Sequence, residues 1–216
     1  MTTNDMHNPV RVACLISGGG RSVVNLHKKI ISAQIPAHIV LVASTRANVA
    51  GIHAAAALGL ETCEIAPLPA DTLDDRLDAA LEKSGAELIV LAGYLRLFRV
   101  ARWKNRCLNI HPSLLPKFGG HGMWGEHVHA AVLTAGEIES GCTVHWADEQ
   151  FDTGSIILQR RCPIHDGMNA TQLAARVFEE ECLALPEALE KVAHWLRHGG
   201  TRPNFTVESN PNQKMN

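Results

Sequence analysis

The chain has 216 residues, of which 46% are hydrophobic and 19% charged, and its formal net charge is -2 at pH 7. This balance is that of a globular domain with a substantial core, and it excludes an intrinsically disordered chain. The Lys and Arg residues are scattered, which argues against a nucleic-acid partner. No apolar run approaches the roughly 20 residues needed to span a bilayer, so no membrane association is expected.

The N-terminus and the cysteines indicate a cytoplasmic protein. The opening sequence MTTNDMHNPV lacks a basic stretch followed by an apolar stretch, so we expect no signal peptide. The six cysteines are widely spaced without a CxxC pair, which favours reduced, buried thiols. We expect disorder over residues 1–9, one folded domain over 10–199 and a flexible tail over 200–216.

Strand and helix patterns alternate along the chain. Apolar runs and helical periodicity predict, in order, a strand at 10–16, a helix after residue 20, a strand at 38–44, a helix at 49–60, a short strand at 61–65, a helix to about 84 capped by Asp71 or Thr72, strands at 86–94 and 107–111, a helix at 125–136, two antiparallel strands at 142–148 and 155–164, and a helix from Asn169 to about His198. Pro186 should break or kink this last helix.

Strands separated by helices predict an α/β fold with a doubly wound, mostly parallel sheet and an antiparallel C-terminal strand. In such sheets ligands bind at the carboxyl ends of the strands. Here these ends are residues 17–20, 44–46, 93–96 and 109–111. The site is therefore expected among these segments.

A glycine loop, SGGGRS, joins the first strand to the first helix. Gly18, Gly19 and Gly20 permit positive φ and close approach of the backbone, and the free N–H groups of the helix start favour an anion. Arg21 and Ser22 can add contacts. Val23 argues against a dinucleotide fingerprint, and no Lys-Ser or Lys-Thr follows the glycines as in a P-loop. The phosphate of a smaller molecule fits better, and the alternative is a tight turn without a ligand.

Asn109 and His111 lie two residues apart at the end of a predicted strand, so both point to one face. An amide and an imidazolium are both hydrogen-bond donors. Aimed at one point, they suit an oxygen that gains negative charge during attack on a carbonyl. A buried Asn and a buried His with satisfied hydrogen bonds are the alternative.

Asp152 lies in a loop between the two antiparallel strands. A carboxylate beside His111 would raise the pKa of the imidazole and keep it protonated, and it can order a water for proton transfer. A loop aspartate that only forms a turn is the alternative.

Metal and nucleophile chemistry have less support. His127 and His129 form an HxH, but on a helix these side chains diverge and cannot share one ion, so no metal is expected. Cys142 and Ser113 lack a neighbouring motif such as GxSxG.

Four segments together resemble the phosphoribosylglycinamide formyltransferase family, the folate-dependent enzymes of purine synthesis. They are LAGYLRLF (91–98), LNIHPSLLPKFGG (108–120), SGCTVHW (140–146) and FDTGSIILQ (151–159). The resemblance covers about residues 10–199 in the same order, and NIHPSLLP is highly specific for folate-dependent formyl transfer. Residues 117–133 look like a longer variant found in one branch of the family.

The resemblance implies a Rossmann-like formyltransferase domain over 10–199, with 10-formyltetrahydrofolate as co-substrate, no metal and a monomeric or homodimeric state. By resemblance the residues have the following roles: catalytic, Asn109, His111 and Asp152; phosphate-binding, Gly18, Gly19, Gly20, Arg21 and Ser22; substrate-binding, Glu181; folate-binding, Leu95, Arg96, Leu97, Phe98, Asp148 and Glu149. The family's phosphate loop usually reads Ser-Gly-x-Gly-Ser/Thr-Asn, so Arg21 and Ser22 depart from it.

The resemblance implies formyl transfer to the amine of glycinamide ribonucleotide. Because the phosphate loop departs from the family pattern, other acceptors stay open, with water giving a formyltetrahydrofolate hydrolase and a sugar-nucleotide amine a sugar N-formyltransferase. A methionyl-tRNA formyltransferase fits less well, since that family carries an added C-terminal RNA-binding domain. A non-catalytic module that binds folate or phosphate is the alternative outside enzymes.

Overall fold

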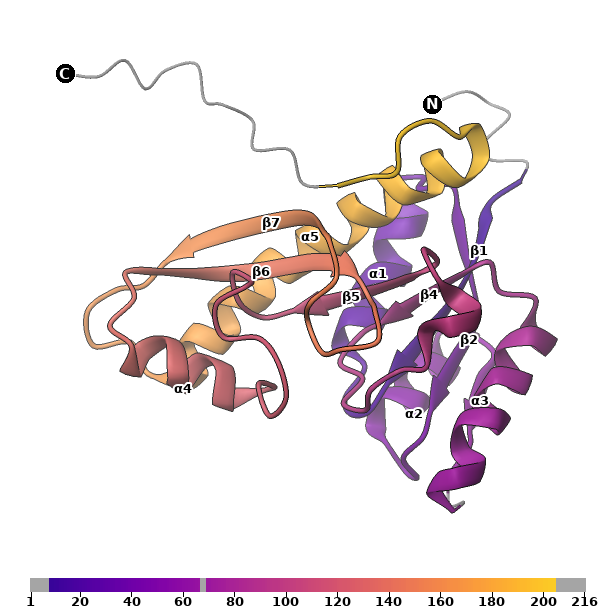
Figure 1. Ribbon diagram of the computed structural model, residues 1–216, viewed down its shortest axis with the longest axis horizontal. Helices are drawn as coiled ribbons and strands as arrows, with labels where there is room; N and C mark the ends of the chain where they lie inside the picture. The colour runs from indigo at the N-terminus through magenta and orange to yellow at the C-terminus, as the bar shows by residue number, and fades with distance from the viewer. Residues whose placement is uncertain (1–7, 67–68, 205–216) are drawn as a thin grey trace.

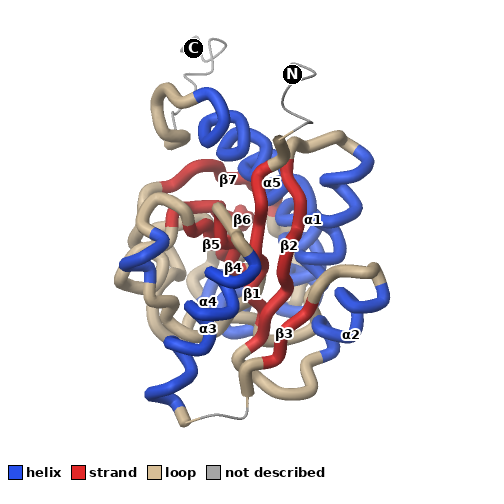
Figure 2. Tube along the Cα trace, turned by 90° about the vertical axis from the view of Figure 1, so that its right-hand side faces the viewer, coloured by secondary structure: helices blue, strands red, loops and turns tan. Residues whose placement is uncertain are grey.

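The computed structural model describes residues 8–66 and 69–204, and it contains a seven-stranded sheet with helices on both faces (Figures 1 and 2). The strand order is β3-β2-β1-β4-β5-β6-β7. The strands are β1 (Val10–Ile16), β2 (Ala37–Ser44), β3 (Thr62–Glu64), β4 (Leu88–Leu91), β5 (Cys107–His111), β6 (Glu139–Trp146) and β7 (Ile156–Pro163). The helices are α1 (Arg21–Ser32), α2 (Ala50–Ala57), α3 (Ala70–Ser84), η2 (Val100–Trp103), α4 (Glu126–Thr134) and α5 (Ala170–His198).

The predicted doubly wound sheet is confirmed. Strands β1 to β5 pair in parallel, whereas β6 is antiparallel to both β5 and β7. Successive strand residues point to opposite faces and enter two separate cores. Val12 and Cys14 pack in the core under α1, α2, α4 and α5, while Ala13 and Leu15 pack in the core under α3 and η2. Burial on both faces explains why these strands are continuous apolar runs.

The winding of the chain reverses between β1 and β4, because β2 and β3 lie on one side of this pair and β5 to β7 on the other. At such a reversal the carboxyl ends of the strands leave a crevice between them. The two ends are linked, since Ser17 N donates to Gly93 O at 3.0 Å and Leu95 N donates to Ser17 Oγ at 3.0 Å.

Three predicted details are corrected. Strand β4 ends at Leu91, so the following residues form a loop instead of continuing the strand. Helix α3 begins at Ala70 after Pro69, and the hydroxyl of Thr72 donates to Pro69 O, so the predicted Asp71 or Thr72 cap is wrong. Helix α5 continues through Pro186, so the predicted break is wrong, because the buried residues on either side of Pro186 hold the helix against the sheet.

Short segments at both ends of the predicted domain are held by hydrogen bonds. The guanidinium of Arg197 donates to Asn8 O at 2.7 Å and to Pro9 O at 3.0 Å, and Trp146 Nε1 donates to Pro203 O at 2.9 Å. Residues 1–7 and 205–216, with most of the predicted disordered ends, lie outside the described residues. No helix within the described ranges is both long and apolar enough to cross a membrane.

Candidate active site

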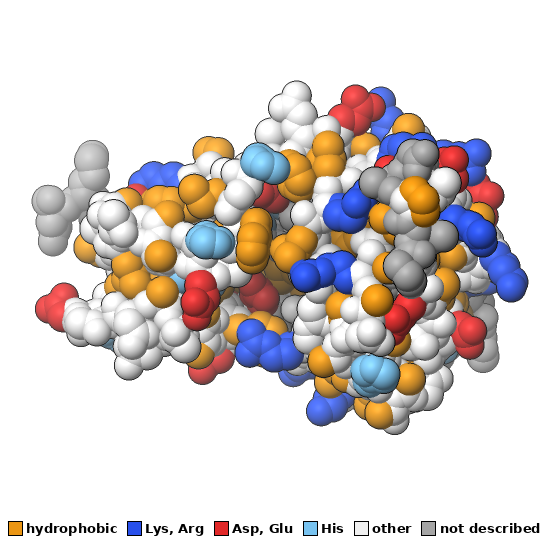
Figure 3. Space-filling view, turned by 90° about the horizontal axis from the view of Figure 1, so that it is seen from below, with side chains coloured by type: hydrophobic (Ala, Val, Ile, Leu, Met, Phe, Trp, Pro, Cys, Tyr) orange, Lys and Arg blue, Asp and Glu red, His pale blue; other side chains and the backbone are white. Residues whose placement is uncertain are grey.

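A cavity of about 620 Å³ opens at the carboxyl edge of the sheet. Figure 3 looks onto this edge and shows a hollow in the middle of the face, with apolar side chains beside it and charged side chains of both signs around it. Its walls come from the start of α1, the loop after β4, the end of β5, the segment before α4, the loop after β6 and one face of α5. Segments far apart in the sequence therefore meet there.

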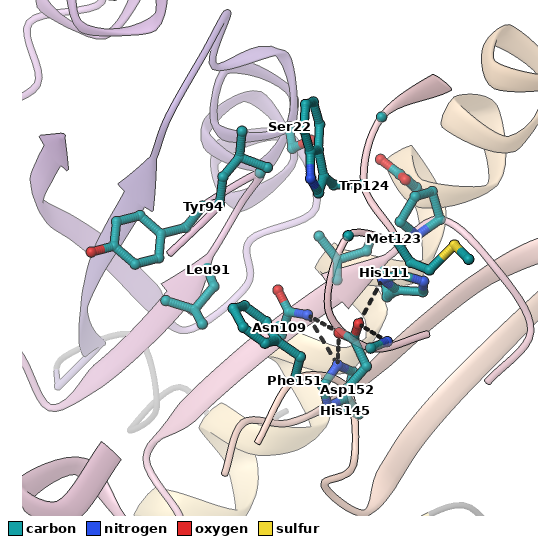
Figure 4. Close-up of a pocket in the computed structure, with 18 of the residues that line it drawn as sticks. Ser22, Leu91, Tyr94, Asn109, His111, Met123, Trp124, His145, Phe151 and Asp152 are labelled. Carbon is teal, nitrogen blue, oxygen red and sulfur yellow. Dashed lines mark hydrogen bonds and ion pairs between the residues drawn. The ribbon is translucent and has the colours of Figure 1, made fainter. Parts of the chain in front are cut away.

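The floor of the cavity holds a buried polar group at the β5–β6 pair (Figure 4). Asn109 and His145 are directly opposite in the antiparallel register, so their side chains lie on the same face. Asn109 Nδ2 lies 3.0 Å from His145 Nε2 and donates to Asp152 Oδ1 at 3.1 Å. His145 Nδ1 lies 2.9 Å from Trp146 O, which can only accept, so Nδ1 carries the hydrogen and Nε2 accepts from Asn109.

His111 lies beside this group and contacts two acceptors. Its Nε2 donates to Phe118 O at 2.8 Å, and its Nδ1 lies 3.4 Å from Asp152 Oδ2. Burial lowers the pKa of His111, and this outweighs the opposing effects of Asp152 and of the Phe118 carbonyl. Asp152 thus raises the pKa of His111 as expected, but the net shift is downward, so the expectation that the carboxylate keeps the ring protonated is wrong in this structure.

Asp152 is held in place through both carboxylate oxygens and through its backbone. Gly120 N donates to Oδ2 at 2.9 Å, and the residue has a φ of 59°, an uncommon value for a side chain that is not glycine. A Cβ on Gly119 would lie 3.1 Å from Asp152 Cβ, so only glycine fits there easily. Burial alone raises the pKa of Asp152, but the neighbouring His145, whose Nε2 lies 3.5 Å from Asp152 Oδ1, together with His111 and the Gly120 amide, leaves it below its usual value.

The two predicted oxyanion donors already have acceptors within the protein. Both hydrogens of the Asn109 amide are directed at His145 and Asp152, and the Nε2 hydrogen of His111 is directed at Phe118 O. A ligand oxygen must therefore replace one of these acceptors before either side chain can donate to it.

The glycine loop enters the cavity only with its last two residues. Arg21 and Ser22 line the cavity, whereas Gly18, Gly19 and Gly20 are not among the lining residues. Gly20 has a φ of 68° as the N-cap of α1, and a Cβ on it would lie 2.7 Å from the Cα of Gly51. Glycine is therefore required at position 20, because the starts of α1 and α2 are in close contact there.

Most of the residues predicted to bind folate also line the cavity. Leu95, Arg96, Leu97 and Phe98 follow β4, and Asp148 follows β6. Asp148 also holds its own loop, because its carboxylate accepts from Thr153 Oγ1 at 2.8 Å. Glu149 is exposed and is not among the lining residues.

The α1–α5 wall carries an ionisable pair at the cavity. The guanidinium of Arg21 lies 4.2 Å from the centre of the Phe178 ring, as in a cation–π contact. Glu181 lies one turn further along α5 and also lines the cavity. Burial raises the pKa of Glu181 to about 7, although the charge of Arg21 opposes the shift.

Sequence reasoning missed His145 as a residue of this site. Its alternation with apolar Val144 and Trp146 in β6 was a usable signal, but only the pairing of β5 with β6 places it opposite Asn109. His127 and His129 diverge on α4 as expected, the first exposed and the second buried. Among residues 8–66 and 69–204 no group of three or more His, Cys, Asp or Glu side chains is arranged to hold a metal ion.

Comparison with known proteins gives a family match over most of the chain. A family model described as "Formyl transferase" matches residues 10–189. The chain is 43% identical over 191 residues to the trifunctional purine biosynthetic protein adenosine-3 of Drosophila pseudoobscura pseudoobscura, covering 85% of this chain and 14% of that protein. It is 35% identical over 184 residues to the chloroplastic phosphoribosylglycinamide formyltransferase of Arabidopsis thaliana, covering 81% of this chain and 63% of that protein.

Solved structures agree with this match. The phosphoribosylglycinamide formyltransferase of Brucella melitensis is 37% identical, with a TM-score of 0.78 over 91% of this chain and 100% of that one. The glycinamide ribonucleotide transformylase 1 of Symbiobacterium toebii is 33% identical, with a TM-score of 0.80 over 87% of this chain and 89% of that one.

Proposed function

The chain belongs to the formyl transferase family, and from this premise we propose that it transfers a formyl group from 10-formyltetrahydrofolate to the amine of glycinamide ribonucleotide, a step of purine biosynthesis. The observation that carries the proposal is the convergence of Asn109, His111 and Asp152 on one cavity, with Nδ1 of His111 at 3.4 Å from Asp152 Oδ2. The lining of this cavity includes residues that follow β4 and residues of α1 and α5.

In the proposed reaction the amine nitrogen attacks the formyl carbon and the carbonyl π electrons move onto oxygen. The Nε2 hydrogen of neutral His111 leaves Phe118 O and, with the amide of Asn109, donates to this oxyanion. The new C–N bond forms, the bond from the formyl carbon to N10 of the folate breaks, and the proton lost by the amine ends on N10. Asp152, whose Oδ2 lies 3.4 Å from His111 Nδ1, supports this transfer as a site for a relaying water.

We assign different parts of the cavity lining to the two substrates. The folate is assigned to Leu95, Arg96, Leu97, Phe98 and Asp148, which combine apolar side chains with two charged groups. Of the predicted phosphate-binding loop, only Arg21 and Ser22 line the cavity. We therefore assign these two residues and Glu181 to the ribonucleotide. A guanidinium at this position provides a charge-assisted contact for a phosphate.

One assay tests the proposal. Purified protein is incubated with 10-formyltetrahydrofolate, and deformylated folate is followed with and without glycinamide ribonucleotide. Release that requires the ribonucleotide supports the proposal. Release without it would indicate a formyltetrahydrofolate hydrolase, release only with a sugar-nucleotide amine would indicate a sugar N-formyltransferase, and no release under any condition would favour a non-catalytic module.

A cytoplasmic location and a monomeric or homodimeric state also belong to the proposal. The relative from Arabidopsis thaliana is chloroplastic, so the compartment is open to direct test. Fractionation with antibody detection addresses the location, and sedimentation equilibrium of the full chain addresses the oligomeric state.

A further inference from the structure

His129 is a buried polar side chain at the cavity that the proposed chemistry leaves unused. It lies in α4 with only 4% of its surface exposed, and it lines the cavity. Its Nδ1 is buried and has no hydrogen-bond partner among the described residues. A buried ring nitrogen without a partner is uncommon in a folded protein, and it bears on which ring nitrogen of His129 carries the hydrogen.

The other two buried histidines of the site are fully engaged. Both ring nitrogens of His111 face protein acceptors, and both ring nitrogens of His145 take part in hydrogen bonds. His129 therefore retains hydrogen-bonding capacity that these two have already used. His127, two residues earlier on the same helix, is exposed and packs with its ring centre 5.0 Å from that of Trp124.

The surroundings of His129 favour a neutral ring. Burial lowers its pKa, the charge of His111 on β5 lowers it further, and Glu126 on the same helix acts in the opposite direction. Arg21 on α1 and Glu181 on α5 are the charged groups of the facing wall. Because a buried N–H without an acceptor is more costly than a bare ring nitrogen, the hydrogen is assigned to Nε2.

Helix α4 contacts the helix that carries Glu181, which is assigned to the ribonucleotide. Thr171 Oγ1 of α5 donates to Glu126 Oε1 at 3.3 Å, which ties the first turn of α4 to the helix that carries Glu181. His129 follows Glu126 by one turn of α4, and His111 lowers its pKa, so the two rings are neighbours. His129 therefore lines the cavity near the reacting centre and on a helix tied to α5.

We propose that His129 is a further substrate-binding residue, whose neutral ring donates from Nε2 to an oxygen of the acceptor substrate next to the reacting amine. The inference rests on the proposed function and names a contact that orients the acceptor. The carbonyl oxygen of the glycinamide group has the required chemistry, because it is an uncharged acceptor adjacent to the amine.

Three substitutions test this contact. The amide nitrogen of His129→Gln can occupy the place of Nε2, that of His129→Asn falls short of it, and His129→Leu has no donor. We expect His129→Leu and His129→Asn to raise the KM for glycinamide ribonucleotide about tenfold, as for loss of one hydrogen bond. The KM for 10-formyltetrahydrofolate should stay within about twofold, and His129→Gln should recover most of the affinity.

The matched control is His127→Leu, which changes the exposed histidine of the same helix and should leave both KM values unchanged. An unchanged ribonucleotide KM in His129→Asn, or equal defects in the Gln and Asn variants with a parallel fall in melting temperature, would overturn the inference alone. A wild-type enzyme without ribonucleotide-dependent turnover would instead overturn the proposed function, and the inference with it.

Discussion

Asn109 depends on residues that lie 36 and 43 positions later in the chain. Its amide hydrogens are directed at His145 and at Asp152, which fixes the amide plane above the cavity floor. A donor whose orientation is set by its neighbours needs little reorganisation when charge develops on a substrate oxygen. His145 and Asp152 compete with the substrate oxygen for the amide hydrogens of Asn109. In the proposed catalytic cycle one of these hydrogens therefore leaves its protein acceptor and donates to the substrate.

Replacement of either donor should therefore slow the chemical step. We expect Asn109→Ala and His111→Ala each to lower kcat about 10²-fold or more, in line with loss of an oxyanion donor. The measurement is steady-state turnover with glycinamide ribonucleotide, with melting temperature recorded to exclude unfolding. Near-normal kcat in both folded variants would rule out the proposed roles of these side chains.

At the scale of elements, the contact between α1 and α2 positions the residues assigned to phosphate. Gly51 N donates to Gly18 O at 3.0 Å, and a Cβ on Gly51 would lie 2.6 Å from that oxygen and 2.7 Å from Gly20 N. The start of α2 is thus packed against the backbone of the loop that leads into α1. A change in α2 can therefore reach Arg21 and Ser22 without touching the cavity.

Gly51→Ala should displace this loop and weaken ribonucleotide binding. We expect a rise of about tenfold or more in the KM for the ribonucleotide, equivalent to a loss of about 1.4 kcal/mol, with a smaller change in the KM for the folate. Ala56→Ser on the exposed side of α2 serves as the control. Equal changes in both KM values would show that the effect is a general loss of packing.

Helix α5 begins with a capping box at Asn169, the residue at which the sequence predicts the start of this helix. The side chain of Asn169 accepts from Gln172 N at 2.9 Å, and the side chain of Gln172 accepts from Asn169 N at 2.9 Å. Two backbone N–H groups that the helix leaves open at its start are satisfied in this way.

Loss of this cap should reduce stability without changing the chemistry. We expect Asn169→Ala to lower the free energy of unfolding by about 1 kcal/mol, which corresponds to a fall of about 2–4 °C in Tm for a domain of this size. Asn169→Ser keeps a capping oxygen and should lie near the wild type. Thermal unfolding of the three proteins makes the comparison, and an unchanged Tm in the alanine variant would contradict it.

At the scale of the whole molecule, the cavity brings together groups whose pKa shifts act in opposite directions on stability. His111 has a lowered pKa, so its contribution to the free energy of unfolding is present above its unfolded pKa near 6.5. This contribution is lost as the pH falls through the pKa of the folded state. Glu181 has a pKa raised to about 7, so its contribution is present below its unfolded pKa near 4.5 and is lost as the pH rises through about 7. At neutral pH the ionisation of Glu181 in its buried position therefore lowers the free energy of unfolding.

Glu181→Gln should remove this destabilisation, because the amide does not ionise. Relative to wild type, the free energy of unfolding of the variant should rise between about pH 4.5 and pH 8, by up to about 3 kcal/mol. Because Glu181 is assigned to the ribonucleotide, the variant should also bind that substrate less tightly. Urea unfolding at several pH values measures the first effect, and a stability difference that does not change with pH would contradict it.

Much of the fold followed from the sequence because local patterns determine local structure. Continuous apolar runs predicted β1, β2, β4 and β5, and helical spacing predicted the helices between them. The sequence also indicated Asn109 and His111 as a same-face pair, since two residues apart on a strand must point the same way. Boundaries such as the end of β4 and the continuity of α5 through Pro186 did not follow, because packing against the sheet decides them.

By itself the sequence determined which side chains are available for chemistry and the order of the strands and helices along the chain. Only the tertiary structure decided which of these side chains meet: His145 opposite Asn109, Asp152 against His111, and His129 at the wall of the cavity. It also decided their charge states, since burial lowers the pKa of His111 where a neighbouring carboxylate alone would raise it. The reason is that strand pairing and desolvation depend on contacts between residues distant in sequence, which local patterns do not specify.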